Sequence, residues 1–212
     1  IGAITKAMGV PFHTDAAQSV GKISVQVDQL GVDLLSIAGH KLYAPKGIGA
    51  LYVRSGLSLE PVIHGAEHER GRRAGTESTM LAVGLGAACR LAAEQPCEEH
   101  LQLLATYFLN KLLEAFGDRV VLNGHMDSRL PNTVNVSFPG LVGQKILDAL
   151  DGIAASTGSA CHSGASGASP VFDAMNCSDA VGLGAIRFSV GRPTTKSQLD
   201  MTVDLLKKVV SG

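Results

Sequence analysis

The sequence predicts an α/β fold, with a mostly parallel sheet in the first part of the chain and a small α+β domain after it. Short apolar runs alternate with helical stretches through the first half, which is typical of parallel strands joined by helices. A long helical stretch then breaks at Pro96, and the remainder mixes short strands with helices. We place a domain boundary at this break, which gives domains at residues 1–95 and 96–212.

The first domain is expected to open with a helix and to end with a long one, with short strands between them. The segment 34–38 is apolar throughout, as expected of a strand covered on both faces, whereas 22–27 alternates like a partly exposed strand. The expected helices are residues 1–9 and 79–93, and the expected strands are 10–13, 22–27, 34–38 and 48–53.

The second domain is expected to begin with a long helix directly after Pro96. A loop rich in serine and glycine, residues 156–169, separates its strands. The expected helices are residues 98–116, 144–150 and 195–210, and the expected strands are 120–122, 133–138 and 185–190.

Composition limits the classes of function. Hydrophobic residues make up 45% of the 212-residue chain, enough for a substantial core, and charged residues only 17%, below the usual quarter. We therefore expect part of the surface to face another subunit or a segment that is absent. The net charge of −1 and the lack of a basic stripe give no case for nucleic acid or a membrane surface as partner.

The ends and the cysteines give expectations about location. The chain begins with Ile1 inside a helix-like segment, so we expect a truncated N-terminus. Four scattered cysteines fit a reducing compartment better than a disulfide framework. We expect a cytoplasmic protein and leave an organellar location open.

Two motif matches carry little weight. The G-x-G triplets in GIGALY, GLGAAC and GLGAIR lack the third glycine of a dinucleotide site. HGAEH, residues 64–68, matches a zinc-peptidase pattern that needs a stable helix, but Pro61 and Gly65 favour a loop. We expect no metal site.

His40 and Lys41 follow directly after the apolar run 34–38, where an open α/β sheet binds ligands. A lysine there can simply reach solvent, or it can act as a nucleophile or base. Asp15 in HTDAAQ ends another short strand, and its ordinary role would be an N-cap for the turn at residues 16–18. A lysine and an aspartate at two strand ends also fit pyridoxal phosphate, which needs a Schiff-base lysine and a carboxylate partner for its ring nitrogen.

Cys161 and Arg187 are the other two candidates for chemistry. Cys161 lies in STGSACHSGASG, among small residues typical of a mobile loop, and the neighbouring His162 could favour its thiolate. Arg187 lies within an apolar strand, where its charge needs a partner. That partner is either a buried carboxylate of the protein or the carboxylate of a substrate.

The sequence resembles the cysteine desulfurases and selenocysteine lyases, within the class-V, fold-type I pyridoxal phosphate enzymes. Six segments carry the resemblance in family order and span most of the chain: HTDAAQSVGK, GHKLYAPKGIGALYV, ERGRRAGTES, LPNTVNVSF, STGSACHSG and IRFSVGRPTT. The resemblance implies a doubly wound large domain followed by the small domain. It also implies that the chain is the C-terminal portion of such an enzyme.

The resemblance assigns roles to residues by motif. It implies that Lys41 is the Schiff-base lysine, that Asp15 partners the pyridinium nitrogen and that Gln18 bonds the ring hydroxyl. His40 is similar to a phosphate contact, and Thr76 to the residue that reaches the phosphate of a neighbouring subunit, which implies a homodimer. Arg187 resembles the clamp for the substrate carboxylate, and Cys161 the thiol that becomes a persulfide.

The implied activity is removal of sulfur from L-cysteine, which gives L-alanine and a persulfide for a sulfur-acceptor protein. A selenocysteine lyase acting on L-selenocysteine is one alternative, and a truncated fragment that only folds or dimerises is another. Ala38 stands where many members of the family have a phosphate-contacting serine, so the resemblance implies one phosphate contact fewer here.

Overall fold

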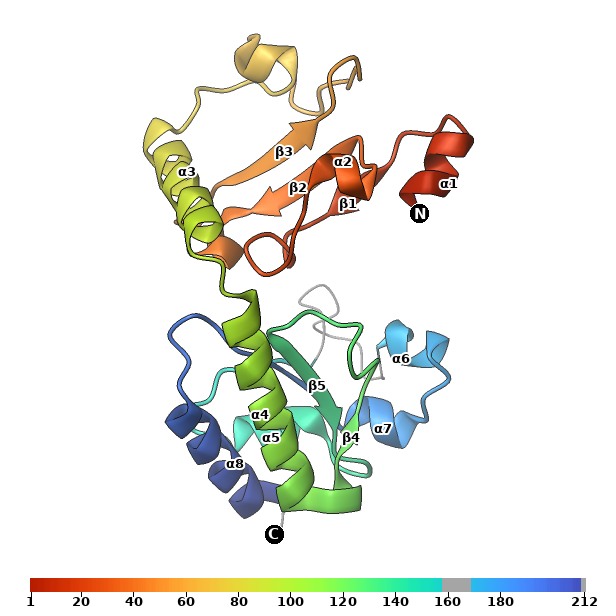
Figure 1. The fold of residues 1–212 in the computed structure, drawn as a ribbon, viewed down its shortest axis with the longest axis vertical. Coiled ribbons are helices and arrows are strands. Elements are labelled where there is room, and N and C mark those ends of the chain that lie inside the picture. Colours follow the sequence, from red (N-terminus) through yellow and green to blue (C-terminus); the bar gives the residue numbers. More distant parts are fainter. Residues whose placement is uncertain (158–168, 211–212) are drawn as a thin grey trace. The chain divides into compact units, whose positions relative to one another are not determined.

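The structure is a computed structural model that describes residues 1–157 and 169–210. The chain separates into two compact units, Ile1–Cys97 and Glu98–Gly212. Each unit has its own three-stranded sheet, and α3 and α4 are the long helices that precede and follow Pro96 (Figure 1).

The first unit is built on the sheet β1-β2-β3. β1 runs parallel to β2, with Asp15 opposite Ser36, and β3 runs antiparallel to β2, with Gly49 opposite Ala38. The carboxyl ends of β1 and β2 therefore share one edge of the sheet. The elements of this unit are α1 (Gly2–Ala7), β1 (His13–Asp15), α2 (Val27–Leu30), β2 (Leu34–Ala38), the 3₁₀ turn η1 (Gly39–Leu42), β3 (Gly49–Val53), the 3₁₀ turn η2 (His68–Gly71) and α3 (Thr79–Glu94).

The prediction of a strand at residues 22–27 is wrong. In the structure this segment forms turns and irregular backbone and then enters α2. Val25 and Val27 nevertheless pack against the buried cluster Ala16, Val32 and Leu35. Side chains two residues apart in this irregular segment thus pack into the core. The sequence therefore alternates between apolar and polar residues in the same way as a half-buried strand.

The second unit is built on the antiparallel sheet β4-β5-β6. Its core packs the sheet against α4 and α4 against α8, and Phe108 meets Phe188 edge to face at 5.1 Å between ring centroids. The elements are α4 (Glu98–Phe116), the 3₁₀ turn η3 (Gly117–Arg119), β4 (Val121–Leu122), β5 (Thr133–Ser137), α5 (Gly143–Asp148), α6 (Pro170–Ala174), α7 (Asp179–Leu183), β6 (Ala185–Ser189) and α8 (Lys196–Val210).

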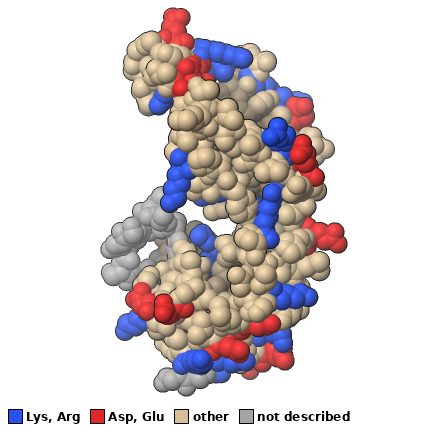
Figure 2. Space-filling view, turned by 90° about the vertical axis from the view of Figure 1, so that its left-hand side faces the viewer, with Lys and Arg blue, Asp and Glu red and all other residues tan. Residues whose placement is uncertain are grey.

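The buried apolar side chains are divided unevenly between the units. Among the described residues, most of them lie in the second unit, on α4, β5, β6 and α8. In the first unit, Leu42 and the inner face of α3 add to the small cluster around Leu35. On the surface, acidic and basic side chains are interspersed on the face that Figure 2 shows. No described helix has the length and apolarity that crossing a bilayer requires.

Candidate functional site

The edge of the first sheet where β1 and β2 end carries the lysine and the aspartate singled out from the sequence. Asp15 is the last residue of β1, and Lys41 follows the end of β2 by three residues, within η1. Because the two strands are parallel, both residues leave the sheet at the same edge. This is the edge at which open α/β sheets bind ligands.

The turn that carries His40 and Lys41 is anchored on both sides. Gly39 is buried and its N–H donates to the carbonyl of Ile48 at 3.0 Å. A Cβ at Gly39 would lie 2.8 Å from that oxygen, so only glycine fits. Leu42, at the other end of the turn, is 5% exposed. The side chain of His40 is exposed and that of Lys41 half-buried, on a turn fixed by its neighbours.

The carboxylate of Asp15 is oriented by the backbone. One of its oxygens accepts the N–H of Ala17 at 2.8 Å, so Asp15 does make the local turn contact that is its ordinary role. The side chain stays exposed at the strand end, where it can meet a ligand as well. On the same face, the ring of His13 is hydrogen-bonded to the Ser36 hydroxyl at 2.8 Å.

Lys22 is a neighbour of this edge that the sequence did not single out. Its ammonium donates to the carbonyl of Gln18 at 2.9 Å. Burial lowers the pKa of Lys22 below its ordinary value, the charge of Lys41 lowers it further, and Cys97 opposes the shift. The signal available in the sequence was a lysine four residues after Gln18, in a segment otherwise short of charge.

The structure brings Gln18 to the same part of the fold but does not tie Thr76 to it. Gln18 lies in the turns that follow β1 and is exposed. Thr76 is exposed between η2 and α3, and within the described residues no hydrogen bond links it to Asp15, Gln18 or Lys41. The role expected of Thr76 therefore stays a prediction.

Arg187 lies in the second unit, at the centre of β6. Its backbone bonds Ser156 on one side, and β5 pairs with β6 on the other, with Asn135 opposite Arg187. The Nε atom of Arg187 is buried without a hydrogen-bond partner. A buried donor that lacks an acceptor is costly, and a guanidinium matches the two oxygens of a carboxylate. Arg187 is thus suited to bind an anion that comes from outside the described residues.

A family model described as aminotransferase class-V matches residues 1–201. The chain belongs to the aminotransferase class-V family. This confirms, at the level of the family, the resemblance drawn from the motifs.

The relatives carry the name of one activity. "Cysteine desulfurase IscS" of Dictyoglomus turgidum is 44% identical over 214 residues, which are 99% of this chain and 54% of the relative. "Probable cysteine desulfurase, mitochondrial" of Dictyostelium discoideum is 42% identical over 215 residues, 99% of this chain and 47% of the relative. The chain spans about half the length of the curated relatives that it matches.

Solved structures agree on the fold. A "NIFS-LIKE PROTEIN" matches with a TM-score of 0.86 and 31% identity, over 98% of this chain and 55% of that one. The NifS-like protein from Rickettsia africae also matches with a TM-score of 0.86, at 25% identity, over 100% of this chain and 56% of that one. The expected α/β fold of a class-V, fold-type I enzyme is confirmed.

Cys161, with His162, lies outside the described residues. The described cysteines, Cys89, Cys97 and Cys177, are free thiols. Cys97 lies close to the turns that follow β1, because its thiol donates to the carbonyl of Gly21 at 3.4 Å. The role of Cys161 therefore depends on the sequence motif.

HGAEH forms no zinc-binding helix in this class-V chain. The segment is irregular and runs into η2, where Glu69 and Arg70 have φ angles of 51° and 60°. The predicted loop is confirmed. In residues 1–157 and 169–210, no three His, Cys, Asp or Glu side chains gather as metal ligands would.

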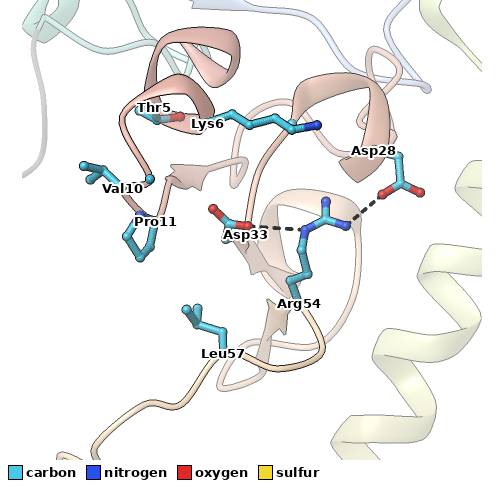
Figure 3. Close-up of a pocket in the computed structure, with 10 residues that line it drawn as sticks. Thr5, Lys6, Val10, Pro11, Asp28, Asp33, Arg54 and Leu57 are labelled. Carbon is cyan, nitrogen blue, oxygen red and sulfur yellow. Dashed lines mark hydrogen bonds and ion pairs between the residues drawn. The ribbon is translucent and has the colours of Figure 1, made fainter.

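A pocket of about 590 Å³ lies at the opposite edge of the first sheet (Figure 3). It is lined by residues that precede β1 and β2 and follow β3, so it faces away from Asp15 and Lys41. Arg54 lies in it and pairs with Asp28 at 2.9 Å and Asp33 at 3.4 Å, and it also donates to the Val32 carbonyl. These charges pair with one another and link the residue that follows β3 to α2 and to the residue that precedes β2.

Proposed function

We propose that the protein is a pyridoxal phosphate-dependent cysteine desulfurase, which converts L-cysteine to L-alanine and leaves the sulfur as a persulfide on Cys161. The observation that carries the proposal is the shared edge of β1 and β2, where an anchored lysine and a backbone-oriented aspartate leave the sheet together. The identity of 44% to a protein named cysteine desulfurase supports the same assignment.

The donor set at this edge suits pyridoxal phosphate. Lys41 would hold the cofactor covalently, and Asp15 would keep the ring nitrogen protonated. Gln18 would bond the ring hydroxyl, His40 the phosphate, and Thr76 the phosphate of a neighbouring subunit. When bound, pyridoxal phosphate supplies an electron sink for a carbanion at the substrate Cα. Once the amine of the substrate has taken its place, the freed Lys41 would take the Cα proton as general base.

Arg187 and Cys161 would act on the substrate itself. The guanidinium of Arg187 would bind the α-carboxylate, which satisfies its unpaired Nε. The thiolate of Cys161 would attack the substrate sulfur. The carbon–sulfur bond breaks as the sulfur–sulfur bond forms, and the bond's electron pair remains with the carbon that becomes the methyl group of alanine.

The proposal extends to partners and place. The role of Thr76 requires a homodimer, and the persulfide requires a sulfur-acceptor protein. The protein would act in the cytoplasm or in an organelle, with no membrane or nucleic acid among its partners.

The test uses the chain joined to the part of the Dictyoglomus turgidum relative that it does not cover. This chimera is incubated with pyridoxal phosphate and L-cysteine, and alanine is measured beside a persulfide label located by peptide mass spectrometry. We expect alanine, with the label on Cys161. Cys161→Ser should abolish both and leave cofactor attachment to Lys41 intact, whereas Cys177→Ser should change neither.

Other outcomes separate the alternatives. Alanine from L-selenocysteine but none from L-cysteine would replace the proposal by a selenocysteine lyase. A folded chimera that attaches no cofactor at Lys41 would contradict the proposal and leave a module that only folds or dimerises. A label on Cys89, Cys97 or Cys177 would remove Cys161 from its role.

A further inference from the structure

The second sheet has one apolar and one polar face. Val134 and Val136 of β5 are buried, as are Ile186 and Phe188 of β6, on the face that packs against α4. The residues between them point the other way, because side chains alternate along a strand. The polar face thus carries Asn135 and Ser137 from β5, with Arg187 from β6.

Asn135 and Arg187 are direct neighbours on this polar face. They are opposite each other in the antiparallel pairing of β5 and β6. Residues paired in this way have Cβ atoms about 4.5–5.5 Å apart and project on the same side of the sheet. One ligand can therefore touch both side chains.

The amide of Asn135 is held in one orientation from the β4 side. Asn123, which follows β4, donates from its side-chain Nδ2 to the side-chain Oδ1 of Asn135 at 2.9 Å and to the Ser137 hydroxyl at 2.7 Å. Ser137 is fully buried, so this network is fixed in the sheet. With its side-chain oxygen bound to Asn123, Asn135 presents its two N–H groups away from Asn123, and they make no hydrogen bond within the part of the chain that the structure describes.

Arg187 adds a second donor group without an acceptor. Its Nε is buried and unpartnered, and none of the ion pairs in residues 1–157 and 169–210 includes it. Two neighbouring donors, one cationic and one neutral, match the two oxygens of a single carboxylate.

We propose that Asn135 is a substrate-binding residue, which donates its side-chain N–H to the same carboxylate that Arg187 binds. The identity of this carboxylate as the α-carboxylate of an amino acid rests on the proposed function. Arg187 supplies the charge that attracts the anion. Asn135, whose amide is held by Asn123, fixes the orientation of the carboxylate, because its N–H group makes a hydrogen bond in one direction only. As a neutral group, it adds no attraction at long range.

The test is carried out on the chain without cofactor. Sodium acetate is titrated at constant ionic strength while the ¹⁵N–¹H NMR signals of the Asn135 amide and the Arg187 Nε–H are followed. We expect both to shift together with one saturation curve. Acetamide, which has the same shape without the charge, should shift neither.

Variants separate binding from structure. Asn135→Asp keeps the oxygen that accepts from Asn123 but repels a carboxylate, so acetate affinity at Arg187 should fall roughly tenfold or more, as for a hydrogen bond to a charged group. Asn110→Asp makes the same change at an exposed position of α4 and should leave the affinity unchanged. Asn135→Ala removes the hydrogen bond to the charged carboxylate without adding repulsion, so it should weaken binding by roughly tenfold, and by less than Asn135→Asp does.

The outcomes are distinct from those of the proposed function. A shift at Arg187 with none at Asn135, or equal affinity in Asn135→Asp and Asn110→Asp, would show that Asn135 is only structural. No shift at either residue would overturn the site as a carboxylate site. Coupled shifts would uphold the inference even if the chimera made no alanine. If it does make alanine, Asn135→Ala should raise KM for L-cysteine and leave kcat unchanged.

Discussion

Two glycines on α3 test how this helix supports the turn that carries Lys41. A Cβ built at Gly84 would lie 2.9 Å from Cδ and 3.0 Å from Cγ of Pro45, in the loop after η1. A Cβ built at Gly86 would meet nothing within 4 Å. The same substitution, Gly→Ala, should therefore act in opposite directions at positions two residues apart on one helix.

The magnitudes follow from two effects. In a helix interior, alanine is favoured over glycine by about 1 kcal/mol, and this gain applies at both positions. At Gly84 the new methyl group lies well inside the favourable carbon–carbon separation of about 3.5–4.0 Å, and overpacking of this kind costs about 1–3 kcal/mol. The gain from alanine is the same in both variants and cancels when they are compared. Gly84→Ala should therefore be about 1–3 kcal/mol less stable than Gly86→Ala.

The assay is urea unfolding followed by far-ultraviolet circular dichroism, which suits a chain with no tryptophan. With a urea dependence of about 2 kcal/mol per molar, the two midpoints should differ by roughly 0.5–1.5 M. Gly86→Ala should unfold at higher urea than the parent chain. Equal stabilisation of both variants would show that α3 does not press on Pro45, and the fixed turn around Lys41 would lose that support.

Three further predictions concern the core, the pH dependence and the cofactor. Leu112 is fully buried, so Leu112→Ala should lower the free energy of unfolding by about 2–5 kcal/mol. Leu113 is 38% exposed, and Leu113→Ala should lower it clearly less. Equal losses in urea unfolding would contradict the packing of α4. Because the pKa of Lys22 is lowered from 10.5 in the folded chain, the unfolded chain binds more protons just below that pH, and stability should rise with pH there. Lys22→Met should lack this rise, and parallel urea midpoints for parent and variant across the alkaline range would refute it. In the chimera, Lys41→Ala should remove borohydride-fixed cofactor and lower alanine production by orders of magnitude, and near-normal turnover would show that Lys41 is only a surface residue.

The sequence was most informative where local pattern and packing agree. The apolar run Leu34–Ala38 is β2 with the expected limits, and the helix expected after Pro96 is α4, Glu98–Phe116. Both signals are strong because few structures other than a buried strand fit a short apolar run, and few other than a helix fit apolar residues repeated every three or four positions over a long segment. α6 was missed because it has only five residues, although Ser169 caps it and Pro170 starts it, a pair typical of a helix start.

The candidate site was predictable to the extent that it depends on strand ends. Asp15 and Lys41 could be assigned to one edge because parallel strands end together. Lys22 could not, because its burial depends on tertiary contacts: the backbone of Gly21 lies against Leu42, and Cys97 bonds the Gly21 carbonyl. The pairing of Asn135 with Arg187 likewise depends on strand register, which joins residues 52 positions apart in sequence.

The uneven division of the buried core has a consequence for how the chain opens. The second unit holds most of the buried side chains, so amides in α4 and β5 should exchange with solvent only when that whole unit unfolds. In the first unit, β1 and β2 rest on a few buried residues around Leu35 and should exchange through local openings. The edge that presents Lys41 thus belongs to the unit that opens more easily, and a ligand that joins Asp15 to Lys41 would bridge β1 to η1 and slow those openings.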